Sequence, residues 1–427
     1  MKYLLIDTAN MFFRARHSAH RASDTWTKLG FALHVTLMSV NKVVRRFGAD
    51  HVVFALEGRS WRKDFYEPYK KNRAVARAAL SETEAEEDRM FWETYDSLTK
   101  YLREKTNCSV IRCETAEADD VIARWIALHP QDQHVIISSD TDFVQLVAPN
   151  VNQYNGITDE LITLEGIFND KGQPIVDKKT KQPKAAPDPA WLLFEKCMRG
   201  DTSDNVFSAY PGVREKGTKN KVGLREAFAD MNKKGYNWNN LMLQRWSDHN
   251  GVEHRVLDDY ERNRALIDLT AQPVEIKQLV DSCVQEQISH KDIGQVGVHF
   301  MKFCGKFELV KLSDSADQVG SWLNKTYNGV EHRVLDDYER NRALIDLTAQ
   351  PVDIKQLVDS CVQEQISHKD IGQVGVHFMK FCGKFELVKL SDSADQVGSW
   401  LNKTYNGVLN DSSKTSNRQS VLDTQAG

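Results

Sequence analysis

Short apolar runs alternate with longer amphipathic segments through the first 190 residues of the chain. Five of these runs are rich in β-branched residues and have the length of buried strands; they cover 3–7, 51–57, 108–113, 134–140 and 151–155. Apolar positions at helical spacing fill the intervals, at 30–48, 87–105 and 119–129. This alternation predicts an α/β fold, with a parallel sheet flanked by helices on both faces.

The pattern changes beyond residue 170. Residues 170–188 are rich in Lys, Pro and Asp and indicate an excursion or linker, whereas apolar spacing from 190 onward is helical. The polar tail at 407–427 is expected to be disordered. We therefore expect a sheet domain at 1–190, followed by helical regions.

A long internal repeat dominates the second half. Residues 251–328 recur as 329–406 with 77 of 78 positions identical, the exception being Glu275 against Asp353. Such near-identity indicates one recent tandem duplication or an error of sequence assembly, because the units of solenoid proteins usually diverge. We expect one copy, most simply 251–328, to pack on the preceding residues and the other to be dispensable.

Composition excludes several classes of protein. The net charge is −4 and the pI about 6.4, so any nucleic-acid surface must be a local patch. No run of 18 apolar residues exists, which argues against a membrane span, and the N-terminal apolar stretch is interrupted by Asp7 like a strand rather than a signal peptide. Seven cysteines without C-x-x-C spacing favour a reduced, cytoplasmic compartment and no zinc site.

Acidic residues follow the ends of the predicted strands. The set comprises Asp7, Glu57, Glu117, Asp119, Asp120, Asp140 and Asp142. Ligands of open α/β sheets bind at the carboxyl ends of the strands, so these side chains are expected to meet at one edge. Any one of them could simply cap a helix or end a strand, but the whole set favours a site for divalent metal ions. Mg²⁺ prefers oxygen ligands, and two such ions can promote cleavage of a phosphodiester.

Two further segments carry candidate chemistry. Residues 199–205, "RGDTSDN", add Asp201 and Asp204, and the loop that follows holds Lys216, Lys219 and Lys221 among glycines. Residues 60–77 interleave cations with rings, as proteins that grip single-stranded nucleic acid do. The candidates there are Arg62, Lys63, Tyr69, Lys70, Lys71, Arg73 and Arg77. A solvated turn and a solvated helix face are the alternatives.

These segments resemble the flap-endonuclease-like 5′ nucleases, and most closely the ribonuclease H/5′-3′ exonuclease of tailed phages. The resemblance rests on "LLIDTANMFFRA", "VVFALEGRSWRKDFYEPYKKNR", "ETAEADDVIA", "VIISSDTDFVQL" and "MRGDTSDNV", which follow the order of the family. It implies a PIN-like nuclease domain at 1–190, a helix–three-turn–helix at 191–250 that binds duplexes, and a C-terminal helical segment at 251–328 with its near-identical copy at 329–406.

The resemblance also implies which residues surround each metal ion and which lie at the base of the arch. One Mg²⁺ would be surrounded by Asp7, Glu57, Glu117, Asp119 and Asp140, with Asp120 beside them. A second would be held by Asp142, Asp201 and Asp204, and Mn²⁺ can substitute for either ion. The base of an arch that gates single strands would carry Lys70, Lys71 and Arg73.

The function implied is Mg²⁺-dependent 5′-3′ hydrolysis of RNA–DNA hybrids, duplex 5′ ends and 5′ flaps, removing RNA primers during DNA replication. We expect water bound to the metals to attack in line. The substrate would be DNA or RNA–DNA hybrid, with a single-stranded-DNA-binding protein as partner, in a monomer of the cytoplasm, or of the host cytoplasm if phage-encoded. A PIN-type ribonuclease of single-stranded RNA and a non-catalytic nucleic-acid-binding protein are the alternatives.

Overall fold

The computed structural model describes residues 1–18, 24–213, 223–248, 250–288, 291–327, 352–367, 374–384, 396–397 and 401. The chain divides into two compact units, 1–331 and 332–427. In the described part of the chain, no helix has the length and apolar character needed to cross a membrane.

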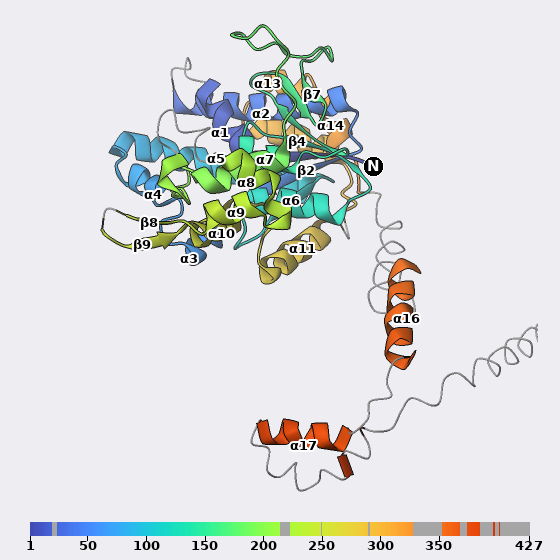
Figure 1. Ribbon diagram of the computed structural model, residues 1–427. Helices are drawn as coiled ribbons and strands as arrows, with labels where there is room; N and C mark the ends of the chain where they lie inside the picture. Colours follow the sequence, from blue (N-terminus) through green and yellow to red (C-terminus); the bar gives the residue numbers. More distant parts are fainter. Residues whose placement is uncertain are drawn as a thin grey trace, which may run out of the picture. The chain divides into compact units, whose positions relative to one another are not determined.

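A seven-stranded sheet forms the centre of the first unit (Figure 1). Its spatial order is β3-β2-β1-β4-β5-β6-β7, and the first five of these strands are parallel. They are β1 (Lys2–Asp7), β2 (His51–Leu56), β3 (Ser109–Arg112), β4 (Gln133–Ile137) and β5 (Val151–Asn155). The predicted fold class, an α/β domain with a parallel sheet flanked by helices, is confirmed.

Two antiparallel strands extend the sheet, β6 (Glu160–Thr163) and β7 (Gly166–Phe168). The sequence pattern did not reveal them, because they are short and every residue but Gly166 is only partly buried. A half-buried edge ribbon gives no continuous apolar run from which a strand could be inferred.

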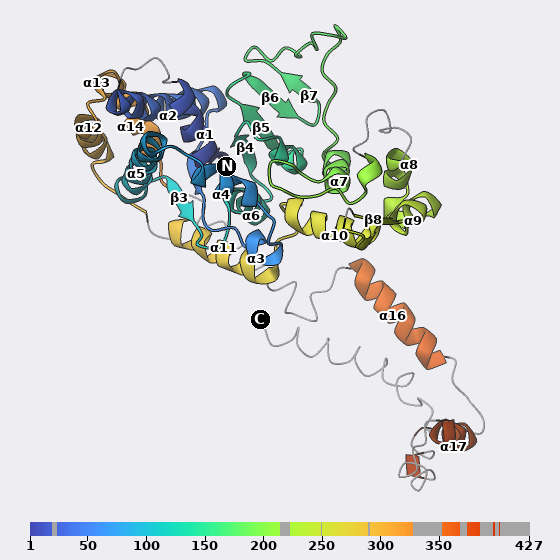
Figure 2. The same cartoon turned by 90° about the vertical axis from the view of Figure 1, so that its left-hand side faces the viewer.

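Helices cover both faces of the sheet, as Figure 2 shows for α2 on one face and α11 on the other. The first layer comprises α1 (Thr8–Ser18), α2 (Thr25–Phe47), α5 (Glu82–Lys105), α12 (Val296–Lys306), α13 (Val310–Ser313) and α14 (Ala316–Leu323). The second comprises α6 (Ala118–Leu128) and α11 (Val274–Ile288). Strand residues alternate between these two cores, since Leu4 and Ile6 face the first while Tyr3 and Leu5 face the second.

A third core lies beside the sheet and is built mainly from residues beyond 188. Its helices are α7 (Pro189–Arg199), α8 (Leu224–Ala229), α9 (Tyr236–Met242) and α10 (Val256–Ile267). Contrary to the all-helical expectation, it also holds a hairpin of β8 (Arg245–Ser247) and β9 (Glu253–Arg255). The Trp246 and His254 rings stack across the hairpin, with centroids 4.3 Å apart, which is a cross-strand pairing that helical spacing cannot reveal.

Two helices of the repeat are described in both units. In the first unit α11 and α12 pack into the two cores of the sheet. The second unit contains α16 (Val352–Ser367) and α17 (Val374–Lys384), which begin 78 residues after α11 and α12. The expected disordered tail lies outside the described residues, and the proposed domain boundaries stay a prediction.

Candidate active site

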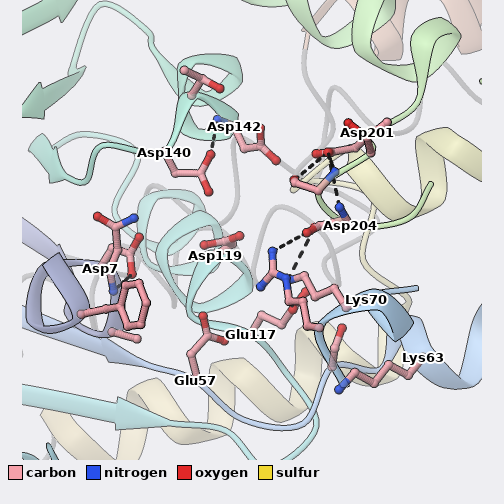
Figure 3. Close-up of a pocket in the computed structure, with 18 of the residues that line it drawn as sticks. Asp7, Glu57, Lys63, Lys70, Glu117, Asp119, Asp140, Asp142, Asp201 and Asp204 are labelled. Atoms are coloured by element: carbon pink, nitrogen blue, oxygen red, sulfur yellow. Dashed lines mark hydrogen bonds and ion pairs between the residues drawn. The ribbon is translucent and has the colours of Figure 1, made fainter. Parts of the chain in front are cut away.

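A cleft of about 1150 Å³ lies beyond the carboxyl ends of the parallel strands (Figure 3). Eight acidic side chains line it; they are Asp7, Glu57, Glu117, Asp119, Asp140, Asp142, Asp201 and Asp204. Cationic side chains share the same walls, among them Lys63, Lys70, Arg73, Arg77, Lys196 and Arg199. The chain therefore gathers acids from five separate segments, and cations from three, around one space.

Strand ends and helix starts fix these acids. Asp7 ends β1, and Glu57 follows the last residue of β2. Glu117 caps the N-terminus of α6, which places Asp119 in the first turn of that helix. Negative charge is stabilised at helix N-termini, so part of the acidity is compatible with the local backbone. Asp140 plays the corresponding role for the short 3-10 helix η1 (Thr141–Leu146) and accepts a hydrogen bond from the Asp142 amide at 3.0 Å.

Gly58 brings two of these segments together. Its amide donates to the Ala116 carbonyl at 3.0 Å, so the chain after β2 runs against the loop before α6. A Cβ at position 58 would overlap the carbonyl oxygens of Cys113 and Ala116. Only glycine permits this approach, which sets Glu57 beside the start of α6.

Three of the acids, Asp7, Glu57 and Asp119, form what we call the unpaired group. None of the three makes an ion pair with any residue that the structure describes. Burial raises the pKa of Asp7 to about 6, and the nearby Asp140 adds to the shift against hydrogen bonds from Ser138 and Asn10.

The same causes act on the other two members. Enclosure by the protein, followed by the charge of Glu117, raises the pKa of Glu57 to about 7. Burial raises the pKa of Asp119 well above its ordinary value, and the charges of Asp7 and Glu57 raise it further. The charge of Lys70 lowers all three pKa values but does not outweigh these causes, so negative charge on the unpaired group is only partly compensated.

The remaining acids with identified cation partners are Glu117, Asp142, Asp201 and Asp204, which we call the bridged group. Lys196 forms ion pairs with both Asp142 and Asp201. Burial opposes ionisation of Asp201, but hydrogen bonds from Lys196 and Ser203 lower the pKa of Asp201 to about 2. Burial, with smaller contributions from the charges of Asp140 and Asp201, raises the pKa of Asp142 despite its lysine partner.

Lys70 provides the second bridge. Its ammonium group pairs with Glu117 and lies 3.6 Å from Asp204. Burial would raise the pKa of Glu117, but Lys70 and Arg62 outweigh it and lower that pKa. Arg73 completes the bridge by pairing with Asp204.

Two assignments need correction. Asp120 is fully buried and points away from the cleft, where its carboxylate accepts hydrogen bonds from the Arg62 guanidinium at 2.8 and 2.9 Å. The Trp61 indole and the Glu117 amide also donate to it. Asp120 thus forms a buried ion pair with Arg62 and is not among the residues that line the cleft. Arg62 is only 1% exposed and is therefore not accessible to nucleic acid.

The basic candidates separate by their surroundings. Tyr69 is buried, and its hydroxyl lies 3.0 Å from Glu117 and 3.1 Å from Asp204, so it orients carboxylates rather than stacking on a base. Lys71 is exposed and pairs with Glu67 outside the cleft. The candidates Lys216, Lys219 and Lys221 lie outside the described residues.

Three residues that contact the acids of the cleft were not identified from the sequence: Lys196, Asn10 and Ser138. Lys196 lies on α7, where it has the appearance of an ordinary helix-surface lysine. The Ser138 hydroxyl donates to Asp7 at 2.8 Å and the Asn10 amide donates to it at 3.2 Å. Ser138 does follow β4, so the rule that placed the acids at strand ends could have identified it.

The donor set fits a hard divalent cation. Every candidate ligand is a carboxylate, and the raised pKa values of the unpaired group indicate that an added cation would stabilise its negative charge. Among the described residues no three acidic, His or Cys side chains converge closely enough to chelate an ion directly. Mg²⁺ usually keeps several waters and binds through only one or two carboxylates, so it does not need such a group.

Comparison with known proteins shows what the first part of the chain is similar to. Residues 2–172 match the family model of the 5′-3′ exonuclease N-terminal resolvase-like domain. DNA polymerase I of Rhizobium leguminosarum is 29% identical over 42% of this chain, but the chain spans only 15% of that protein. Flap endonuclease Xni of Shewanella loihica is 25% identical over 53% of this chain and 77% of its own length.

A phage protein is also similar. Ribonuclease H of Enterobacteria phage T4 is 30% identical over 42% of this chain and 54% of its own length. The resemblance to the flap-endonuclease-like 5′ nucleases is confirmed by these matches, and the similarity to the 5′-3′ exonuclease N-terminal domain extends over residues 2–172. The expectation of a nuclease is thereby confirmed at the level of the family.

Proposed function

We propose that the chain is a Mg²⁺-dependent, structure-specific 5′-3′ nuclease. Its substrates are duplex DNA 5′ ends, 5′ flaps and RNA–DNA hybrids, and its role is the removal of RNA primers during DNA replication. The observation that carries this proposal is the cleft in which eight carboxylates and a set of cations face one another. The names of the relatives, flap endonuclease and ribonuclease H, support the choice of substrates.

Two divalent ions would divide the eight acids of the cleft between them. Asp7, Glu57, Glu117, Asp119 and Asp140 would hold the first, and Asp142, Asp201 and Asp204 the second. When bound, such ions supply the Lewis acid that activates water and offsets charge on a scissile phosphate. Mn²⁺, which takes the same oxygen ligands, can replace Mg²⁺.

The chain's own cations bind and orient the phosphate backbone. Arg73 and Arg77 stand exposed at the wall of the cleft, and Lys63 is exposed beside them. Arginine and lysine contacts to phosphate position a substrate without reading its bases, so we expect specificity for structure rather than sequence. Lys70, held between Glu117 and Asp204, places a positive charge where the phosphate would enter.

We also propose the organisation outlined from the sequence. The nuclease domain is 1–190, the duplex-binding region 191–250, and the helical segments 251–328 and 329–406. The protein acts as a monomer in the cytoplasm, with a single-stranded-DNA-binding protein as partner.

One assay separates the proposal from a PIN-type ribonuclease of single-stranded RNA. The full chain is incubated with 5′-labelled flap DNA, RNA–DNA hybrid and single-stranded RNA, each in Mg²⁺, Mn²⁺ or EDTA. We expect cleavage of the flap and the hybrid in either metal and none in EDTA. Preferential cleavage of single-stranded RNA would contradict the proposal.

A further inference from the structure

The acids assigned to the second ion come from two separate segments of the chain. Asp142 belongs to η1, whereas Asp201 and Asp204 belong to the loop 200–206 that follows α7. Figure 3 shows Asp142 on one side of this part of the cleft and the other two acids opposite it. Mg²⁺ requires nearly ideal octahedral geometry, so carboxylates from two segments can share one ion only if the segments keep a fixed spacing.

Asn263 of α10 holds both ends of the loop 200–206. Its side chain is fully buried, and its Nδ2 donates to the Cys197 carbonyl at 2.8 Å and to the Phe207 carbonyl at 2.7 Å. The first carbonyl precedes the loop and the second follows it, so a single amide group joins the two ends. The Asn263 Oδ1 accepts hydrogen bonds from Arg262 at 2.9 and 3.1 Å, so both ends of the amide have partners.

Gln145 attaches η1 to the same helix. Its Nε2 donates to the Ile267 carbonyl at 3.1 Å, and its Oε1 accepts from the Leu269 amide at 2.9 Å. Ile267 is the last residue of α10 and lies about one helical turn beyond Asn263. The two segments that carry the acids of the second ion are therefore both bound to the C-terminal part of α10 by a side-chain amide.

The end of α10 also lies next to these acids. Ile267 and Leu269 line a small hollow together with Asp142, Asp201 and Asp204. Because one helix contacts both segments here, its backbone sets the spacing between the acid on η1 and the acids of the loop.

We infer that Asn263 and Gln145 are positioning residues, which hold the acids of the second-ion site at the spacing that one divalent cation requires. The inference rests on the proposed function, which assigns that ion to Asp142, Asp201 and Asp204. Neither amide side chain is among the residues that line the cleft, so both act through the backbone of the segments that carry the acids. Removal of outer hydrogen bonds at metal sites typically lowers metal affinity or activity by about 10–100-fold.

Asn263→Leu tests this role in the full chain. Leucine has a similar volume but no donor, so the carbonyls of Cys197 and Phe207 lose a shared partner. The Mg²⁺ concentration that gives half-maximal cleavage of flap DNA should rise by about 10–100-fold. The rate at saturating Mg²⁺ should stay within about three-fold of the wild-type rate, because the ion restores the geometry once it is bound. A loss of structure would instead lower the rate at every Mg²⁺ concentration.

Binding of Mn²⁺ without DNA gives a readout that does not depend on cleavage. Electron paramagnetic resonance measures free Mn²⁺ during a titration of the protein and resolves ions of different affinity. We expect Asn263→Leu to weaken one of two bound ions by about 10–100-fold and to leave the other nearly unchanged. Gln145→Leu should act in the same direction, because it releases η1 from the same helix. Gln145 is only partly buried, so this variant tests the inference even if Asn263→Leu does not fold.

Asn107→Leu is the matched control. Asn107 is also buried, and its Nδ2 donates to the carbonyls of Ile293 and Asn324 at 3.2 and 3.1 Å. It is not among the residues that line the cleft. Both leucine variants should lower the Tm, because each leaves two carbonyls without a donor, but only Asn263→Leu should change the affinity for an ion.

Three results would overturn the inference. The first is wild-type affinity for both Mn²⁺ ions in Asn263→Leu and Gln145→Leu. The second is an equal loss of affinity in Asn107→Leu, and the third is a cleavage rate that added Mg²⁺ does not restore. Failure of the proposed function would be seen separately, as a wild-type chain that cleaves no flap or hybrid in Mg²⁺.

Discussion

The two sides of the cleft differ in how their crowded negative charge is compensated. The bridged group has internal cations, because Lys196 joins Asp142 to Asp201 and Lys70 joins Glu117 to Asp204. The unpaired group forms no ion pair within the described residues, and the charge of Lys70 offsets only part of the shift in its pKa values. Its pKa values are raised, whereas the pKa of Asp201 is lowered to about 2.

The difference indicates what each side contributes. Acids that already hold a lysine are stable without further ligands, whereas acids that lack one destabilise the fold whenever they ionise. Burial of unpaired acids is a cost that proteins tolerate at functional sites. The unpaired group is therefore where we expect an added cation to change stability most.

Asp119→Asn should have the largest effect. It removes one charge from the unpaired group, so we expect flap cleavage to fall by on the order of 10³-fold or more. In EDTA its Tm should rise, because repulsion by Asp7 and Glu57 is relieved. The paired readouts are cleavage of labelled flap DNA and thermal unfolding, and binding of the flap in EDTA should be retained. A variant that cleaves at the wild-type rate would exclude the site.

Asp120→Asn is the same chemical change as Asp119→Asn at the adjacent position, but it should lower the stability of the fold. Arg62 would keep its charge inside the protein with one partner reduced, and breaking a buried ion pair costs about 3–5 kcal/mol. We expect a clear fall in the free energy of unfolding, measured by urea titration in EDTA. An unchanged or higher value would mean that Arg62 and Asp120 do not form the structural pair.

Asp7→Asn should make stability depend on pH in a defined window. The pKa of Asp7 is about 6 in the folded chain against an ordinary 3.8, so the folded state binds the proton more tightly than the unfolded state does. The wild type consequently loses stability as pH rises from about 4 to about 6. Above that window the Asn variant should be the more stable by about 3 kcal/mol, and below it the two should converge. Urea titrations of both proteins in EDTA at about pH 3.5 and about pH 8, below and above the window, provide the measurement.

Lys71→Met should have the smallest effect and provides a control for its neighbour Lys70. Lys71 is exposed and pairs only with Glu67 among the described residues, so its removal should change stability by less than about 0.5 kcal/mol. If it contacts one phosphate, the slope of log affinity against log salt should fall by about 1. Lys70→Met should instead destabilise the fold, because it leaves Glu117 and Asp204 without that partner. Anisotropy with flap DNA and thermal unfolding separate the two variants.

The sequence predicted which acids meet, because that prediction requires only that the strands run in the same direction. It does not require their order in the sheet. All five apolar runs became parallel strands, and parallel strands present their carboxyl ends at one edge whatever their order. Asp7, Glu57 and Asp140 could therefore be placed together without knowledge of the sheet. The same rule does not place β6, β7, β8 and β9, whose hairpins depend on cross-strand contacts.

Side-chain partners could not be predicted in this way. Asp119 and Asp120 are adjacent in one helical turn and are the same type of residue, yet one faces the cleft while the other is bound to Arg62. The direction of each is set by rotation of α6 against its neighbours, which a local pattern does not contain. Lys196 was not identified for the same reason, since its two acid partners, Asp142 and Asp201, lie 54 and 5 residues away in the sequence.

Gly58 has a consequence for anyone who substitutes residues near the cleft. The spacing between the end of β2 and the start of α6 depends on a side chain that is not there, since even one methyl group would collide with the peptide oxygens of Cys113 and Ala116. Gly58→Ala would force those two backbones apart and draw Glu57 away from Glu117 without touching either carboxylate. The absence of a side chain at position 58 thus sets the distance between the two segments that carry Glu57 and Glu117.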